Sequence, residues 1–160
     1  MTKIIIVFCE GQHDIAFLSK VLFVDGFIPY KKKIKDFIKP LNKQYEIELS
    51  KKEIADKKLG FQSEYMVPSV ALHKDENTLV LLHNLNGDGK ATERNKILSM
   101  YQNIQSDDDD FTNFNLNFRF LYFFDADDKG IQTRVNEINS ELNLSDNLEH
   151  NKINTIDLAE

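Results

Sequence analysis

Three carboxylates stand directly after apolar runs of this sequence. Glu10 follows the run KIIIVFC, and Asp125 and Asp127 follow the run FRFLYFF. Continuous apolar runs rich in β-branched and aromatic residues are typical of parallel strands that are buried on both faces. Ligands of parallel α/β sheets bind at the carboxyl ends of the strands. The three acids are therefore expected at the edge of the sheet where chemistry takes place.

Carboxylates that converge on one point need a counter-charge. If the two strands are neighbours, Glu10, Asp125 and Asp127 would repel one another and resist ionisation. A divalent cation removes this conflict, and ligation by oxygen alone favours Mg²⁺, with Mn²⁺ as an alternative. The chain has one cysteine and four scattered histidines, so no zinc cluster is indicated. The sequence predicts a Mg²⁺ site made by Glu10, Asp125 and Asp127.

Each candidate strand is followed by a turn and then by a helical pattern. In the first strand-turn-helix segment, Asp14 is the expected N-cap of the helix and Gly26 is the expected end of the helix. The expected strands end at Glu10, near His83 to Asn84, and at Asp125; the expected helices begin near Asp14, Thr92 and Ile131. Three repeats of this plan predict an α/β fold with a central, mainly parallel sheet and helices on both faces.

A segment of about residues 28–77 fits this plan poorly, and we interpret it as an insertion at the sheet edge. It carries the patterns of two short helices, within residues 30–45 and 50–61, and of a hairpin that turns at Lys74 to Asn77. Near the C-terminus INTIDL, residues 153–158, is a candidate for one further strand.

Length and charge limit the class of protein. A chain of 160 residues fits a single domain, 1–160. Its net charge of −6 disfavours a protein that coats nucleic acid, yet residues 31–58 hold ten of the 20 basic side chains. Two interpretations stay open for this basic segment, a patch that contacts phosphate and a solvated helical face, and the second is favoured.

The N-terminal apolar run is too short for a signal peptide or a membrane span. The single cysteine gives no disulfide framework. We therefore expect a cytoplasmic protein without a membrane partner.

The motifs resemble those of the Toprim (topoisomerase-primase) domain family, and among its members the small Toprim/OLD-like nucleases and the ribosomal-RNA maturation nucleases. The first family motif is a hydrophobic strand ending in Glu-Gly with an acidic residue shortly after, matched by IIIVFCEGQHD. The last is a hydrophobic strand ending in Asp-x-Asp, with glycine five and arginine nine residues after the first Asp, matched by Gly130 and Arg134. The middle motif is matched loosely by LVLLHNLNGDG. The resemblance implies a Toprim-like Rossmannoid fold of three layers.

The resemblance also implies roles. Glu10 would transfer protons or share the metal, while Asp125 and Asp127 would hold Mg²⁺ against the phosphodiester. Gly11 would let the backbone approach the phosphate, and Gly130 would permit a sharp turn into the last helix. The residues expected to contact nucleic acid are Gly11, Lys90, Lys129 and Arg134.

Three further side chains have alternative interpretations. Asp14 is interpreted as a helix N-cap rather than a metal ligand. Asp128 fits an outer contact of the site and a helix N-cap equally well. His83 is interpreted as a hydrogen-bonded structural histidine rather than a residue of the crevice.

Two functions of different classes follow from these residues. One is a Mg²⁺-dependent enzyme that acts on phosphodiester bonds of nucleic acid, most simply a nuclease. The other is a non-catalytic Toprim-like binding module that works within a larger assembly. The partners considered are nucleic acid, DNA or RNA, and beside it a partner protein or a homo-oligomer.

Overall fold

The structure is a computed structural model that describes residues 2–50, 66–87, 89–106, 116–125 and 127–142. The chain divides into two compact units, Met1–Phe124 and Asp125–Glu160. The single domain over 1–160 stays a prediction.

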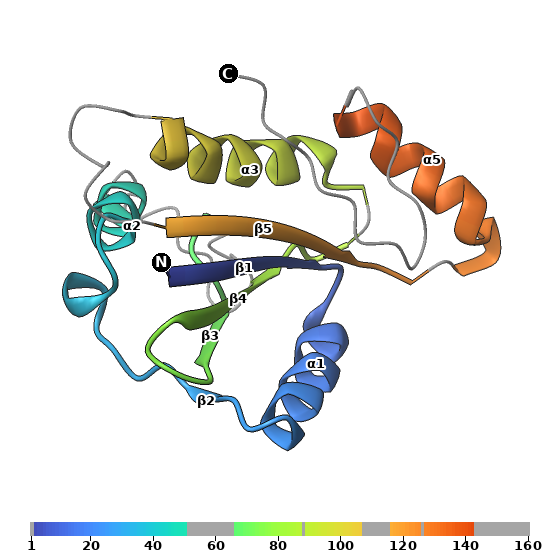
Figure 1. Ribbon diagram of the computed structural model, residues 1–160. Helices are drawn as coiled ribbons and strands as arrows, with labels where there is room; N and C mark the ends of the chain where they lie inside the picture. The colour runs from blue at the N-terminus through green and yellow to red at the C-terminus, as the bar shows by residue number, and fades with distance from the viewer. Residues whose placement is uncertain (1, 51–65, 88, 107–115, 126, 143–160) are drawn as a thin grey trace. The chain divides into compact units, whose positions relative to one another are not determined.

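The first unit contains a five-stranded sheet of order β2-β3-β4-β1-β5 (Figure 1). Its strands are β1 (Thr2–Cys9), β2 (Ile28–Pro29), β3 (Val70–His73), β4 (Thr78–Asn84) and β5 (Leu116–Phe123). β1 pairs in parallel with both β4 and β5, whereas β3 runs antiparallel to both β4 and β2. The α/β class is confirmed, but the sheet is mixed and not the mainly parallel one that was expected.

The helices follow the strands much as the sequence predicts. In the first unit they are α1 (Gln12–Val24), the short 3₁₀ helix η1 (Ile34–Asp36), α2 (Leu41–Ser50) and α3 (Ala91–Ser106). In the second unit the 3₁₀ helix η3 (Asp127–Lys129) precedes α5 (Ile131–Leu142). None of the described helices has the length and apolar composition that a membrane crossing needs.

Alternation along β1 divides the core of the first unit into two clusters, because successive side chains of a strand point to opposite faces. Ile4, Ile6 and Phe8 pack with residues of α2 and α3. Val7 and Cys9 pack on the other face with α1. Figure 1 accordingly shows α3 and α1 on opposite sides of β1. The apolar run that made β1 recognisable is therefore buried from both sides.

The segment of residues 28–77 contains β2, η1, α2 and β3. The predicted hairpin is confirmed, since β3 and β4 pair antiparallel across the turn at residues 74–77. The helix predicted within 30–45 begins only at Leu41, directly after Pro40. Proline disfavours helical geometry in the residue before it, which explains the late start. The predictions for residues 51–61 and 153–158 lie outside the described residues.

Candidate functional site

The parallel strands β4, β1 and β5 end level with one another. Cys9, the last residue of β1, is in register with Asn84 of β4 and with Phe123 of β5. Glu10 and Phe124 each follow these paired residues. The strand adjacency on which the sequence prediction depended is therefore present in the first unit.

Backbone hydrogen bonds join the loop after β1 to the loop after β4. Leu85 N donates to Cys9 O at 3.0 Å, and Gly87 N donates to Glu10 O at 2.8 Å. The φ angle of Gly87 is 124°, a left-handed value that side-chain-bearing residues rarely adopt. The glycine-rich turn of the middle motif thus supports the main chain of Glu10.

Gly11 begins helix α1 as its N-cap residue. Its backbone N donates to Asp14 Oδ2 at 2.8 Å, so this amide is engaged within the protein. A Cβ atom added at Gly11 would meet nothing within 4 Å, which leaves open space beside the backbone. The predicted approach of phosphate to Gly11 has room, but the Gly11 N–H is already bonded.

Asp14 corrects one expectation. The structure places Asp14 inside α1 instead of at its N-cap, which is Gly11. The carboxylate still serves the helix start, because it accepts the Gly11 amide and lies in the first turn, where the helix dipole favours negative charge. Asp14 therefore stabilises the start of α1, although not as its N-cap residue.

Asp125 and Asp127 belong to the second unit. The carbonyl oxygen of Asp125 accepts a hydrogen bond of 3.2 Å from Arg134 Nε, and its side chain is exposed. Asp127 is the first residue of η3, and its side chain lies outside the described part of the structure. Gly130 has a φ of 79° directly before α5, so the expected sharp turn at this glycine is present.

The basic residues expected to contact nucleic acid have internal partners. Lys129 Nζ lies 3.2 Å from Glu137 Oε1, and Arg134 Nη1 lies 3.1 Å from Glu137 Oε2. Arg134 is only 7% exposed. Lys90 stands directly before α3 and accepts the Arg94 amide with its carbonyl. Contact of these residues with nucleic acid stays a prediction.

Arg94 is a residue that the sequence analysis missed. It lies in the first turn of α3 and is 3% exposed, although arginine is rarely buried so completely. Its guanidinium carbon lies 5.1 Å from the ring centroid of Phe124, the residue that follows β5. A signal was present in the sequence, since Arg94 shares a helical stripe with Ile97 and Tyr101.

His83 belongs to a buried hydrogen-bond chain. His83 Nε2 lies 2.8 Å from the Tyr101 hydroxyl, which lies 2.7 Å from the Tyr45 hydroxyl. All three side chains are at most 1% exposed. The structural interpretation of this histidine is confirmed.

Cys9 is not suited to nucleophilic chemistry. It is fully buried on the α1 face of the sheet. Burial, and after it the negative charge of Asp14, raises the pKa of the Cys9 thiol to about 12. The thiolate form that attacks electrophiles is therefore almost absent near neutral pH.

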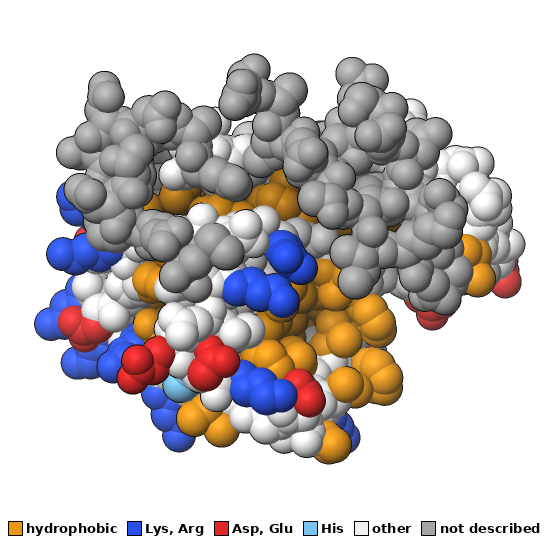
Figure 2. Space-filling view, in the orientation of Figure 1, with side chains coloured by type: hydrophobic (Ala, Val, Ile, Leu, Met, Phe, Trp, Pro, Cys, Tyr) orange, Lys and Arg blue, Asp and Glu red, His pale blue; other side chains and the backbone are white. Residues whose placement is uncertain are grey.

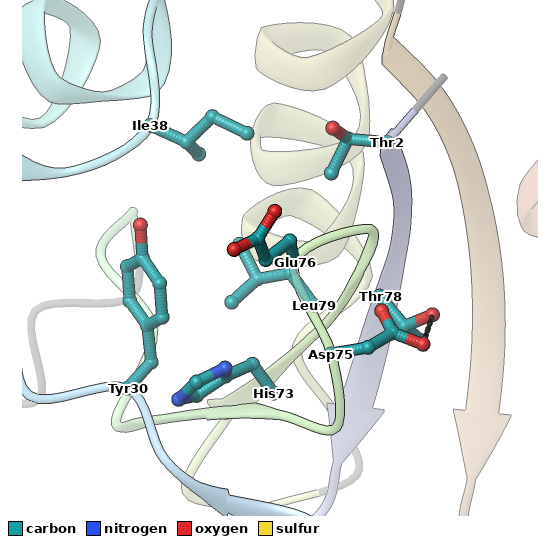
Figure 3. Close-up of a pocket in the computed structure, with 8 residues that line it drawn as sticks. All are labelled: Thr2, Tyr30, Ile38, His73, Asp75, Glu76, Thr78 and Leu79. Atoms are coloured by element: carbon teal, nitrogen blue, oxygen red, sulfur yellow. Dashed lines mark hydrogen bonds between the residues drawn. The ribbon is translucent and has the colours of Figure 1, made fainter.

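A pocket of about 250 Å³ lies at the opposite ends of the strands (Figure 3). Thr2 and Thr78, the first residues of β1 and β4, line it together with Tyr30 and His73. The Asp75 carboxylate at its rim closes the hairpin by accepting the Asn77 amide at 2.7 Å. Because ligands of parallel sheets bind at the carboxyl ends of strands, this pocket is not the candidate site.

The donor chemistry of Glu10, Asp125 and Asp127 fits a hard divalent cation, since all three supply carboxylate oxygens. Within the described residues, however, no group of three or more His, Cys, Asp or Glu side chains is close enough to hold a metal ion. Glu10 lies in one unit and both aspartates lie in the other. The metal site stays a prediction from sequence.

Comparison with protein-family models, with curated proteins and with solved structures gives no match to this chain.

Proposed function

We propose that this protein is a Mg²⁺-dependent enzyme that acts on phosphodiester bonds of nucleic acid, as a nuclease of the Toprim/OLD-like kind. The observation that carries the proposal is the parallel pairing of β1 with β5, in which Cys9 is level with Phe123. Glu10 and the segment leading into Asp125 therefore start from adjacent strand ends. We extend this proposal to a Toprim-like, three-layer arrangement of the whole chain.

The proposed roles follow the chemistry of each side chain. Bound Mg²⁺ would neutralise the charge that develops on the phosphodiester. Asp125 and Asp127 would supply carboxylate oxygens to the ion. Glu10, partly buried beside the Gly87 loop, would exchange a proton with the reacting oxygen.

The first test is metal binding by the full chain. Titration calorimetry with Mn²⁺, alone and with a non-cleavable oligonucleotide, should give a site that is lost in the Asp125→Asn, Asp127→Asn double variant. Asp36→Asn, an exposed aspartate of η1, is the matched control and should bind as the wild type does. Equal affinity in the double variant and in the wild type would exclude the proposed ligands.

The second test is cleavage. Single- and double-stranded DNA and RNA should be incubated with Mg²⁺ or Mn²⁺ and with wild-type protein or Asp125→Asn, which reveals contaminating nuclease. Cleavage above that of the variant is expected for at least one substrate. If the wild type cleaves nothing more than the variant, the enzyme proposal is wrong.

The alternative is a non-catalytic Toprim-like module that works with a partner protein or as a homo-oligomer. The observation in its favour is that both Lys129 and Arg134 form ion pairs with Glu137. Nucleic-acid binding without cleavage would support this alternative.

A further inference from the structure

Two buried arginines occupy equivalent positions after two of the parallel strands. Arg94 lies in the first turn of α3, which follows β4, and Arg134 lies in the first turn of α5, which follows β5. Each arginine amide donates to the residue directly before its helix, Lys90 O at 2.9 Å and Gly130 O at 3.2 Å. Their exposures are 3% and 7%.

This position is unfavourable for a cation. The N-terminus of a helix carries partial positive charge, so a cation in the first turn opposes the helix dipole. Burial adds a desolvation cost, because it removes the guanidinium from water. The helix dipole therefore explains neither arginine, and the contacts of their side chains must be considered.

Each arginine contacts one of two consecutive residues. In the first unit the Arg94 guanidinium lies 5.1 Å from the ring centroid of Phe124. In the second unit Arg134 Nε donates to the carbonyl oxygen of Asp125 at 3.2 Å, while its Nη1 donates to Glu137 Oε2 at 3.1 Å. The peptide bond between Phe124 and Asp125 is where the chain passes from one unit to the other. Each side of this bond is thus held from within its own unit.

Arginine is chemically suited to both contacts. Its planar guanidinium can lie against an aromatic ring while its N–H donors remain available in the plane. Its Nε and Nη1 atoms point in fixed directions, so one side chain can bind a carbonyl and a carboxylate together. Lysine keeps the charge but has neither the flat surface nor the fork of donors.

We propose that Arg94 and Arg134 are positioning residues that fix the main chain on the two sides of the Phe124–Asp125 bond and thereby set the direction of the Asp125 carboxylate. This inference rests on the proposed function, in which Asp125 is a metal ligand. It assigns to Arg134 an internal role in place of direct contact with nucleic acid.

The experiment uses Arg94→Lys and Arg134→Lys in the full chain, with Arg119→Lys as the control. Arg119 is an exposed arginine of β5 that contributes to neither contact. Three quantities are measured for each variant: urea unfolding, amide hydrogen exchange of peptides covering residues 116–125 and 131–142, and Mn²⁺ affinity.

We expect Arg94→Lys to speed amide hydrogen exchange in residues 116–125. We expect Arg134→Lys to speed it in residues 131–142. Both variants should bind Mn²⁺ about tenfold or more weakly, the usual scale for the loss of a group that orients a ligand. They should remain folded, and Arg119→Lys should match the wild type in all three measurements.

Unchanged exchange in both lysine variants would overturn the claim that the arginines fix the chain, whatever the metal result. Faster exchange with wild-type Mn²⁺ affinity would overturn the positioning role and leave the proposed function standing. A wild-type chain that binds no Mn²⁺ would overturn the proposed function, and with it the positioning role, while the exchange data still decide whether the arginines fix the chain.

Discussion

The Gly87 amide donates a 2.8 Å hydrogen bond to the carbonyl oxygen of Glu10. This bond and the one from Leu85 N to Cys9 O tie the loop after β4 to the residues that end β1. The placement of Glu10 therefore depends on the conformation of a loop that lies about seventy-five residues later in the sequence.

Gly87→Ala should destabilise the protein through backbone strain. A Cβ atom at Gly87 would meet nothing within 4 Å, so the cost comes from the φ angle of 124° and not from a clash. We expect the free energy of unfolding to fall by about 1–3 kcal/mol in a urea titration. Gly89→Ala, in the same loop, is the control, because Gly89 has equally open space and no left-handed φ. This substitution should change the free energy of unfolding by about 0.5 kcal/mol or less. Equal effects of the two substitutions would contradict the assigned strain.

Glu10→Gln should separate chemistry from folding. The amide is nearly isosteric with the carboxylate but does not exchange a proton near neutral pH. Divalent-dependent cleavage should fall by about 10²-fold or more, the usual scale for a lost general acid or base. Urea unfolding should match the wild type, and most nucleic-acid affinity should remain. Undiminished cleavage by this variant would remove Glu10 from the reaction.

Charge reversal of the basic segment should act on binding alone. Figure 2 shows Lys and Arg side chains gathered where η1 and α2 lie, on the side from which β1 starts and away from the end that leads to Glu10. Reversal of Lys31, Lys32, Lys33 and Lys35 should weaken nucleic-acid binding and reduce its salt dependence. The slope of log K against log salt concentration should decrease in magnitude by about 0.7–0.9 for each phosphate that the protein no longer neutralises.

Reversal of Lys20 and Lys96, exposed lysines of α1 and α3, is the control for net charge. If both sets of substitutions reduce affinity and salt slope equally for each charge, the segment is a solvated surface. Filter binding over a salt series measures both quantities.

The buried tyrosine pair should make the protein sensitive to alkaline pH. Burial raises the pKa of Tyr45 and of Tyr101 far above the usual value of a tyrosine hydroxyl. The unfolded chain releases these protons near pH 10, while the folded chain retains them. The contribution of the two tyrosines to the free energy of unfolding is fully present below pH 10 and is lost progressively as pH rises above 10. Urea titrations between pH 8 and pH 11 should show this decline.

Tyr45→Phe should reduce the dependence on alkaline pH, because one proton fewer is retained on folding. It also removes a partner of the Tyr101 hydroxyl, so stability at pH 7 should fall by about 1–3 kcal/mol. Tyr30→Phe is the comparison, since Tyr30 lies outside this hydrogen-bond chain and is only partly buried. Burial raises the pKa of Tyr30 as well, so a smaller reduction of the pH dependence is expected for this variant. An unchanged pH profile in Tyr45→Phe would contradict the assignment.

Local sequence patterns predicted the strand ends well. The apolar runs before Glu10 and Asp125 are β1 and β5, and the helical stripes after them are α1 and α5. These elements carry their periodicity within a few residues. Strand β2 has only two residues, Ile28 and Pro29, and so no periodicity that could have identified it. The mixed character of the sheet depends on long-range pairing that local patterns do not contain.

For the candidate site the sequence supplied acidic residues, whose role stays a prediction. Glu10 and Asp125 were identified because charge directly after an apolar strand is unusual. Arg94 was not identified, because its place on the stripe of Ile97 and Tyr101 indicates burial but does not show that Phe124 is its partner. Asp14 was assigned to the N-cap because Asp is a preferred residue at that position, whereas the N-cap is Gly11 and Asp14 accepts its amide from within the first turn.

The burial of Cys9 provides an intrinsic probe of motion beside Glu10. Its thiol is the only one in the chain and is fully enclosed between β1 and α1. A thiol reagent can modify it only while the end of β1 separates from α1, so the rate of modification reports how often this separation occurs. The native sequence therefore allows opening beside the proposed proton-transfer group to be timed by chemical labelling, with no label introduced.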